Sequence, residues 1–370
     1  MNDSLISEIS LYKLDIRADA PFRISLGLIE SWPNLLVRIT TRDGLYGLGE
    51  GSPVSFITGE TQDVGLEMAH AMARLLLGKD SLAIGPLLHL LDAFVVGSPT
   101  VKSAFDMALY DLAAKRVGLP LYAFLGGEKR AFYTNFAMGL DTPQAMADRA
   151  VRYKEMGALV IKVKLGTNRS DDVDRIRAIR RAIGDEIDLR LDANQGWDVP
   201  TAVAIVQALA PYNIQVCEEP VAHWNNQGLA HVRRHSPIPI MADESVFDHH
   251  DAYRLACMGA CDYFNIKFAK SGGIHNGLKI NAVGEAAGIP CMMGQMGEGR
   301  IGVSAQAHFV CACRNILFVD IDSVLHQVDD PVIGGVQFEG PHVVVPDTPG
   351  HGADLDPAYL ESLQNICIRA

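Results

Sequence analysis

The sequence predicts an α/β protein: a (β/α)8 barrel of the TIM type, with an N-terminal α+β capping domain that the C-terminal tail completes. Two observations carry this prediction. From about residue 133 onward, short apolar segments alternate with amphipathic segments of helical period. These units recur every 24 to 28 residues, and eight strand-and-helix repeats are the number that closes a barrel.

The first 125 residues have a different pattern and are expected to form the capping domain. Apolar and polar residues alternate there as in half-buried strands, and an Asp-Gly pair marks a hairpin turn. Two segments of helical period follow. The expected elements are strands at 6–14 and 34–41, a turn at 42–45, and helices at 64–76 and 101–117.

A long connection between the first two strands is expected at residues 17–33. Pro21, Gly27 and Pro33 should interrupt regular structure in this segment. A connection of that length without its own secondary structure usually serves a function, for instance as a lid.

The barrel is expected to span residues 126–330, and residues 331–370 should return to the cap. A typical barrel helix is predicted at 170–183, between the second and third strands. The eight strands are expected to end at Met138, Lys164, Asp192, Glu218, Asp243, Lys267, Met293 and Asp320.

Composition excludes several classes of protein. With 48% hydrophobic and 21% charged residues, the 370-residue chain is expected to be globular. Its net charge is −12 and it has no block of Lys and Arg, so neither nucleic acid nor a membrane is an expected partner. The start of the chain shows no secretory signal, and none of the seven cysteines forms a CxxC pair. A cytoplasmic protein with reduced, buried thiols is therefore expected.

Five successive strand ends carry ionisable residues, and this register is the main functional signal. Each residue alone has an ordinary explanation, such as a helix cap for Asp192 or a solvated lysine for Lys267. Functional residues of (β/α)8 barrels collect at the C-terminal ends of the strands, so residues repeated in this register should meet at one mouth. The five residues are Lys164, Asp192, Glu218, Asp243 and Lys267.

The three carboxylates among them predict a site for Mg²⁺. They come from adjacent strands, and this hard cation prefers carboxylate oxygen and leaves positions open for water or substrate. Asn194, two residues after Asp192, is expected to support the site. Strand alternation turns Glu219 and Glu244 away from it, and both are expected to form supporting salt bridges.

Two lysines on opposite sides of the carboxylates predict proton transfer. A lysine acts as a base near neutral pH only if its pKa falls, through burial or nearby positive charge. Lys162 shares a strand face with Lys164, and together with a metal ion it could supply that charge. With Lys267 across the site, the implied chemistry is removal of a proton α to a carboxylate and its return on the other face.

Five motifs carry a resemblance to the muconate-lactonising branch of the enolase superfamily. They are Lys162-Val163-Lys164, Asp192-Ala193-Asn194, Glu218-Glu219-Pro220, Met241-Ala242-Asp243-Glu244-Ser245 and Asn265-Ile266-Lys267. The resemblance covers nearly the whole chain and implies Lys164 and Lys267 as the acid/base pair and Asp192, Glu218 and Asp243 as Mg²⁺ ligands. It also implies that Lys162 contacts the substrate carboxylate and lowers the pKa of Lys164.

Asp320 and Asp322, at the end of the eighth strand, bear on the substrate. A turn or helix cap would explain them too. If the strand pleat continues, both point to the mouth, where they would repel anionic substrates but bind an ammonium group. The chain resembles the dipeptide epimerases of this branch here and at 57–60. The resemblance implies epimerisation at the C-terminal residue of an L,L-dipeptide.

Two alternatives stay open. The segment 294–300, in which Gln295 and Met296 are expected to touch substrate, is typical of cycloisomerases as much as of epimerases. A cycloisomerase or an N-acylamino acid racemase would use the same barrel, and a barrel that binds without catalysis is the third possibility. Beyond the end of the first strand, the lid offers only Arg23 as a cation, which favours small or apolar substrate side chains. A homo-oligomer is expected.

Overall fold

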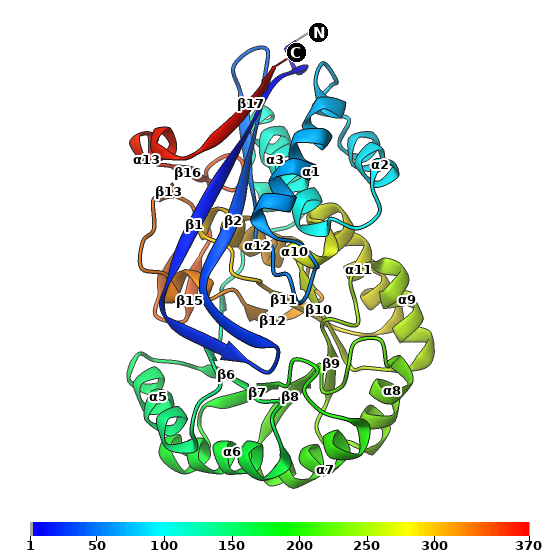
Figure 1. Ribbon diagram of the computed structural model, residues 1–370, viewed down its shortest axis with the longest axis vertical. Helices are drawn as coiled ribbons and strands as arrows, with labels where there is room; N and C mark the ends of the chain where they lie inside the picture. Colours follow the sequence, from blue (N-terminus) through cyan, green and yellow to red (C-terminus); the bar gives the residue numbers. More distant parts are fainter. Residues whose placement is uncertain (1–2, 370) are drawn as a thin grey trace.

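The computed structural model describes residues 3–369, and its core is a barrel of eight parallel strands (Figure 1). The strands pair in chain order, and the Asn135 amide donates to the Val319 carbonyl at 3.2 Å, which joins the first strand region to the last. The strands are β5 (Phe136–Met138), β6 (Val160–Lys164), β7 (Asp188–Asp192), β8 (Ile214–Glu218), β9 (Ile240–Ala242), β10 (Tyr263–Lys267), β11 (Cys291–Gly294) and β12 (Ile316–Asp320).

The barrel strands end where the sequence predicts, within one residue. Strand β9 ends at Ala242, one residue before the predicted Asp243, and β11 ends at Gly294, one residue after Met293. The other six end at the predicted positions. The predicted fold class is confirmed. It could be predicted because most barrel repeats place an apolar strand in the core and an ionisable residue at the strand end.

Seven helices cover the outside of the barrel. Helix α6 shows how they form: Asn168 caps its first turn, Ile176, Ile179 and Ile183 face inward, and it ends at Gly184. The eighth repeat differs from the prediction, because the short 3-10 helix η2 (Ser323–His326) follows β12. The seven helices are α5 (Pro143–Glu155), α6 (Arg169–Ile183), α7 (Val199–Leu209), α8 (Asn226–His235), α9 (His249–Met258), α11 (Ile274–Ala287) and α12 (Arg300–Ala312).

The cap combines an antiparallel sheet with three helices. The sheet order is β17-β1-β2-β3, so the tail returns to pair with the first strand, and β17 lies beside β1 in Figure 1. The elements are β1 (Ile6–Ile24), β2 (Gly27–Thr41), β3 (Tyr46–Gly51), β17 (Asn365–Arg369), α1 (Gln62–Leu76), α2 (Ile84–Phe94) and α3 (Pro99–Arg116).

The remaining elements are short. Strands β13 and β16 pair with each other, and β14, β15 and β4 form a three-stranded sheet. These elements are α4 (Leu121–Phe124), β4 (Phe132–Tyr133), η1 (Ala210–Tyr212), α10 (Phe268–Ser271), β13 (Val332–Gly334), β14 (Gln337–Glu339), β15 (His342–Val344), β16 (Ala353–Leu355) and α13 (Pro357–Ser362).

The prediction of an irregular connection at 17–33 is wrong, because this segment is a β-hairpin. Strands β1 and β2 extend through it and turn at residues 25–26. Pro21 lies where the pairing register shifts, and Pro33 pairs with β1 at a point where β3 does not reach β2. Both positions tolerate proline, because neither requires a backbone N–H group to hydrogen-bond to a neighbouring strand.

The hairpin nevertheless lies over the barrel mouth, as expected of a lid (Figure 1). At its turn, the Ser25 hydroxyl donates to the carbonyl oxygens of Ala193 and Asn194 at 2.9 and 2.7 Å. The Arg23 carbonyl accepts from the Leu140 amide at 2.8 Å. One long hairpin therefore belongs to the cap at its base and contacts the barrel at its tip.

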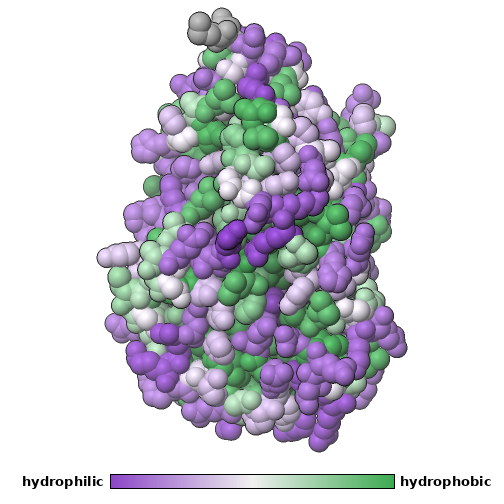
Figure 2. Space-filling view, turned by 180° about the vertical axis from the view of Figure 1, so that it is seen from behind, coloured by the Kyte–Doolittle hydropathy of each residue, from purple (hydrophilic) through white to green (hydrophobic). Residues whose placement is uncertain are grey.

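The face of the protein shown in Figure 2 is mixed in polarity, and the cysteines form no disulfide among residues 3–369. Hydrophilic and hydrophobic residues are interspersed over the face in Figure 2. Within residues 3–369, no helix has both the length and the apolar character to cross a bilayer. All seven cysteines are free, and only Cys257 and Cys367 are exposed.

We expect Gly49→Ala to destabilise the protein by about 1–3 kcal/mol, because overpacking forces neighbouring atoms apart. A Cβ on Gly49 of β3 would lie 2.0 Å from the Ala104 carbonyl oxygen of α3, which is backbone and cannot rotate away. The midpoint of urea unfolding measures the loss. Gly85→Ala on α2 is the matched control, since a Cβ there meets no atom within 4 Å and should leave the midpoint unchanged or raise it.

Candidate active site

The lysine pair of β6 lies at the barrel mouth with both side chains on the same face. Lys162 and Lys164 contact the same carboxylate oxygen of Asp192, at 3.2 and 2.6 Å. Lys162 also reaches Glu218 and Asp320, each at 2.7 Å. Both lysines are buried, so these carboxylates replace the water that a surface lysine would have. The two lysines are therefore not solvated surface residues.

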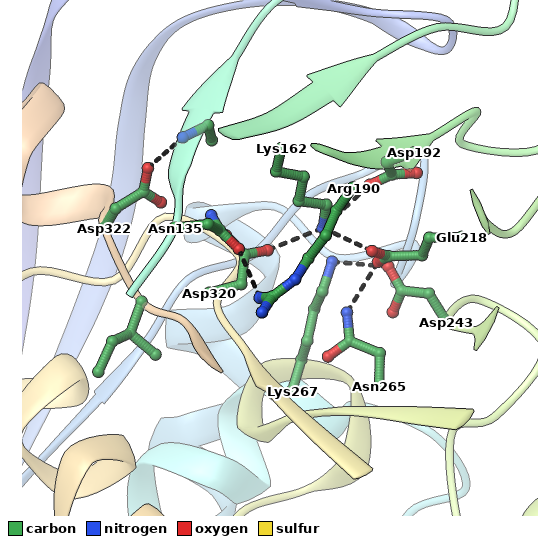
Figure 3. A network of polar contacts seen from close by, with 12 residues as sticks. Asn135, Lys162, Arg190, Asp192, Glu218, Asp243, Asn265, Lys267, Asp320 and Asp322 are labelled. Atoms are coloured by element: carbon green, nitrogen blue, oxygen red, sulfur yellow. Dashed lines mark hydrogen bonds and ion pairs between the residues drawn. The ribbon is translucent and has the colours of Figure 1, made fainter. Parts of the chain in front are cut away.

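Asp192, Glu218 and Asp243 form a candidate metal site (Figure 3). Each offers one carboxylate oxygen, and these oxygens lie within 4.8 Å of one another. All three side chains are fully buried, where like charges so close together need compensation by a cation. The donors are hard oxygens from three adjacent strands, which fits Mg²⁺.

The electrostatics of the three carboxylates differ from one another. Burial, assisted by Asp192, raises the pKa of Glu218 to about 8. Burial would also raise the pKa of Asp243, but Lys267 and Lys270 outweigh it and hold the pKa below its usual range. The difference follows from which lysines lie next to each carboxylate.

Lys267 enters the site from β10, on the opposite side from Lys164. Its ammonium group lies 2.7 Å from Asp243. Burial would lower the pKa of Lys267, but Asp243 outweighs it and raises the pKa above its normal value. For Lys162 also, burial is outweighed by Asp320 and Glu218, and the pKa rises. The expected lowering of the Lys164 pKa by Lys162 remains a prediction.

The two aspartates after β12 occupy different positions. Asp320 lines the pocket, and its oxygens accept from Lys162 and from the Asn135 side chain at 2.7 Å each. Asp322 is outside the pocket lining but next to it, because its carboxylate accepts from the amide of the lining residue Ala137 at 2.5 Å (Figure 3). Asp322 is fully buried. The structure therefore places only Asp320 directly at the pocket surface.

A pocket between the lid and the barrel mouth connects these groups. Gln295 and Met296 line it, as predicted, together with Lys162, Lys164 and Lys267. The remaining wall is largely apolar, which sequence reasoning did not foresee because most of it comes from the lid and the cap. These residues are Phe22, Ile24, Ile29, Trp32, Val54 and Ile57.

The salt bridges expected for Glu219 and Glu244 are wrong. Glu219 accepts hydrogen bonds from the amides of Asp243 and Ser245, at 2.6 and 3.2 Å. Glu244 accepts from the Asn194 side chain at 3.1 Å, and the supporting role of Asn194 at the metal site stays a prediction. Burial raises the pKa of both acids. Neutral donors hold these acids because the cations of the site are already paired with other carboxylates.

Three polar residues of the site were not predicted. Lys270 donates to two backbone carbonyls at 2.6 and 2.7 Å and lies 3.4 Å from Asp243. Asn265 donates to Glu218 at 2.8 Å. Arg190 reaches the Asn135 side chain at 3.3 Å from β7 (Figure 3). Arg190 and Asn265 lie two residues before Asp192 and Lys267, so strand alternation was the signal that could have found them.

Comparison with known protein families agrees with this geometry. Residues 8–126 match the N-terminal domain of the mandelate racemase / muconate lactonizing enzyme family. Residues 145–359 match the enolase C-terminal domain-like family. The chain belongs to the enolase superfamily. In this superfamily the ion at such acidic residues is Mg²⁺, as predicted for Asp192, Glu218 and Asp243.

Its relatives in the superfamily include several epimerases. A "D-Ala-D/L-Ala epimerase" of Cytophaga hutchinsonii is 44% identical, over 98% of this chain and 100% of the relative. A "hydrophobic dipeptide epimerase" of Enterococcus faecalis is 41% identical, over 90% and 95%. These relatives are isomerases, as predicted for this chain.

A solved structure resembles the fold closely. The dipeptide epimerase from Cytophaga hutchinsonii, in complex with Mg and the dipeptide D-Ala-L-Val, superposes with a TM-score of 0.98 at 44% identity. The match covers 99% of this chain and 100% of that one. The barrel, the cap and the returning tail are therefore shared throughout.

We expect Asp192→Asn to weaken Mg²⁺ binding by at least about tenfold, because losing a ligand should cost no less than losing a supporting residue. Isothermal titration calorimetry with MgCl₂ measures this without reference to activity. Asp188→Asn is the control: this aspartate begins the same strand, accepts from Gln215 at 3.1 Å and lies outside the metal site. Equal affinity in the two variants would contradict the assignment.

Proposed function

We propose that the protein is a Mg²⁺-dependent dipeptide epimerase that inverts the α-carbon of the C-terminal residue. The observation that carries this proposal is the placement of two lysines. Lys164 on β6 and Lys267 on β10 line one pocket from opposite sides of the three carboxylates. A substrate carbon held between them would have one ammonium or amine group on each face.

The reaction is a 1,1-proton transfer between the two lysines. One lysine, in its neutral form, removes the α-proton and becomes an ammonium group, leaving an enolate. The lysine on the other face, initially protonated, donates its proton to the same carbon, which inverts the centre. A bound Mg²⁺ supplies stabilisation of the negative charge that develops on the substrate carboxylate. Which lysine acts as base depends on the configuration of the substrate.

Supporting residues extend the proposal to a dipeptide. Lys162 lies beside the metal ligands, where its ammonium group would also attract the substrate carboxylate. The carboxylates of Asp320 and Asp322, at the β12 end, favour the ammonium group of a free amino terminus. A muconate-like dianion would be repelled by these aspartates.

The pocket favours dipeptides with small or apolar side chains. Ile24, Ile29, Val54, Ile57 and Met296 line the pocket, while the one cation of the lid tip, Arg23, is exposed and outside the pocket lining. Transfer of an acidic side chain to such a surface without a cationic partner is costly. The relatives named for alanine and hydrophobic dipeptides support the same preference. Homo-oligomeric assembly and a cytoplasmic location stay predictions.

Lys164→Ala and Lys267→Ala should each lower epimerisation by at least about 10³-fold, since each removes one acid/base group. The reaction is followed in D₂O by the mass increase of a dipeptide such as L-Ala-L-Ala as its α-proton exchanges. Lys129→Ala, at an exposed lysine paired with Asp347, is the control and should retain full activity. Undiminished exchange in the double variant Lys164→Ala/Lys267→Ala would contradict the proposal.

Asp320→Asn and Asp322→Asn should separate the dipeptide epimerase from an N-acylamino acid racemase or a cycloisomerase. Both variants should lower kcat/KM for L-Ala-L-Ala by at least about tenfold, because a hydrogen bond to a charged group is worth roughly 1.5–3 kcal/mol. The measurement is steady-state epimerisation. Unaltered turnover of an N-acylamino acid or of muconate by both variants, in a protein inactive on dipeptides, would instead support the alternatives.

A further inference from the structure

One histidine connects the lid, the pocket and the second aspartate. His326 ends η2, and its ring lines the pocket. Its Nε2 lies 3.2 Å from Oδ2 of Asp322. On the other side, the ring packs against Phe22 of the lid hairpin, with the ring centroids 6.3 Å apart. None of the roles described above uses this residue.

The two oxygens of Asp322 have different environments. Oδ2 receives the Ala137 amide at 2.5 Å as well as His326. Oδ1 is buried and has no hydrogen-bond partner among residues 3–369. A buried carboxylate oxygen without a donor is costly, so a donor that reaches Oδ1 would stabilise Asp322. Asp320, in contrast, already has donors on both oxygens.

Holding Oδ2 fixes the direction in which Oδ1 points. A carboxylate with one donor can rotate about that contact, whereas two donors on the same oxygen from different elements restrain it. The Ala137 amide belongs to β5 and cannot be removed by mutation of a side chain, so His326 is the adjustable part of this restraint. Burial opposes charge on His326, but the contact with Asp322 outweighs it and raises the pKa of the imidazole, which favours an N–H donor at Nε2.

We propose that His326 is a positioning residue for the substrate amino terminus: it holds Asp322 so that Oδ1 accepts the free ammonium group of a dipeptide. This inference rests on the proposed function and deepens it, because it assigns selection of the amino terminus to a residue outside the acid/base and metal groups. Phe22 of the lid packs against the ring, so the lid helps to hold His326 in place.

The test compares two ligands that differ only in the amino group. L-Ala-L-Ala has the ammonium group, and N-propionyl-L-alanine has the same heavy-atom skeleton without it. For His326→Leu we expect KM for L-Ala-L-Ala to rise at least about tenfold, as for loss of a charged hydrogen bond. The kcat should stay within about twofold, and the inhibition constant of N-propionyl-L-alanine should not change. His326→Gln, which keeps an N–H donor, should restore much of the KM.

A matched control is His275→Leu. His275 is also half-buried and contacts the Tyr110 hydroxyl at 3.3 Å, but it lies on α11 outside the pocket lining, so its replacement should leave KM and kcat unchanged. An unchanged KM in His326→Leu would overturn the inference, and so would equal loss for both ligands, which indicates a structural role. If the unaltered protein exchanges no dipeptide α-proton, the proposed function itself fails.

Discussion

The site depends on opposite charges buried together in one small volume. Carboxylates of Asp192, Glu218, Asp243 and Asp320 meet the ammonium groups of Lys162, Lys164, Lys267 and Lys270, and each of these eight side chains is almost inaccessible to water. Any one of them alone would be expelled from such a place or neutralised. The barrel solves this by bringing them from successive strands to a common end, so that every charge has a partner. The same arrangement leaves lysines on two sides of a metal-binding centre.

Much of the barrel could be predicted from sequence because its constraint is periodic. A strand that is apolar along its length and ends in an ionisable residue can be recognised from local sequence. Eight strand ends, separated by seven steps of nearly constant length, are compatible with few folds other than a barrel. The lid hairpin could not be predicted in this way. Proline has no N–H group, so Pro33 interrupts a strand only where a neighbouring strand would need that hydrogen bond. Which strand lies next to Pro33 is decided by the tertiary structure.

The hydrogen-bond donors of Glu219 and Glu244 could not be predicted from sequence for a related reason. Strand alternation correctly turned Glu219 and Glu244 away from the metal ligands, but their donors are the amides of a neighbouring segment and the side chain of Asn194. Backbone amides occur at almost every residue and carry no sequence signature. Likewise, the alternation that predicted Asp320 and Asp322 on one side did not reveal that the Ala137 amide and His326 hold Asp322 outside the pocket lining.

The pairing of β17 with β1 makes the cap sheet depend on residues that are synthesised after the whole barrel. The first strand is synthesised early but lacks one of its two neighbours until residues 365–369 emerge. The barrel residues, which lie between these segments in the chain, are complete before then and can form while the cap is still unfinished. The sheet that anchors the lid hairpin is therefore completed only after the barrel segments have been synthesised.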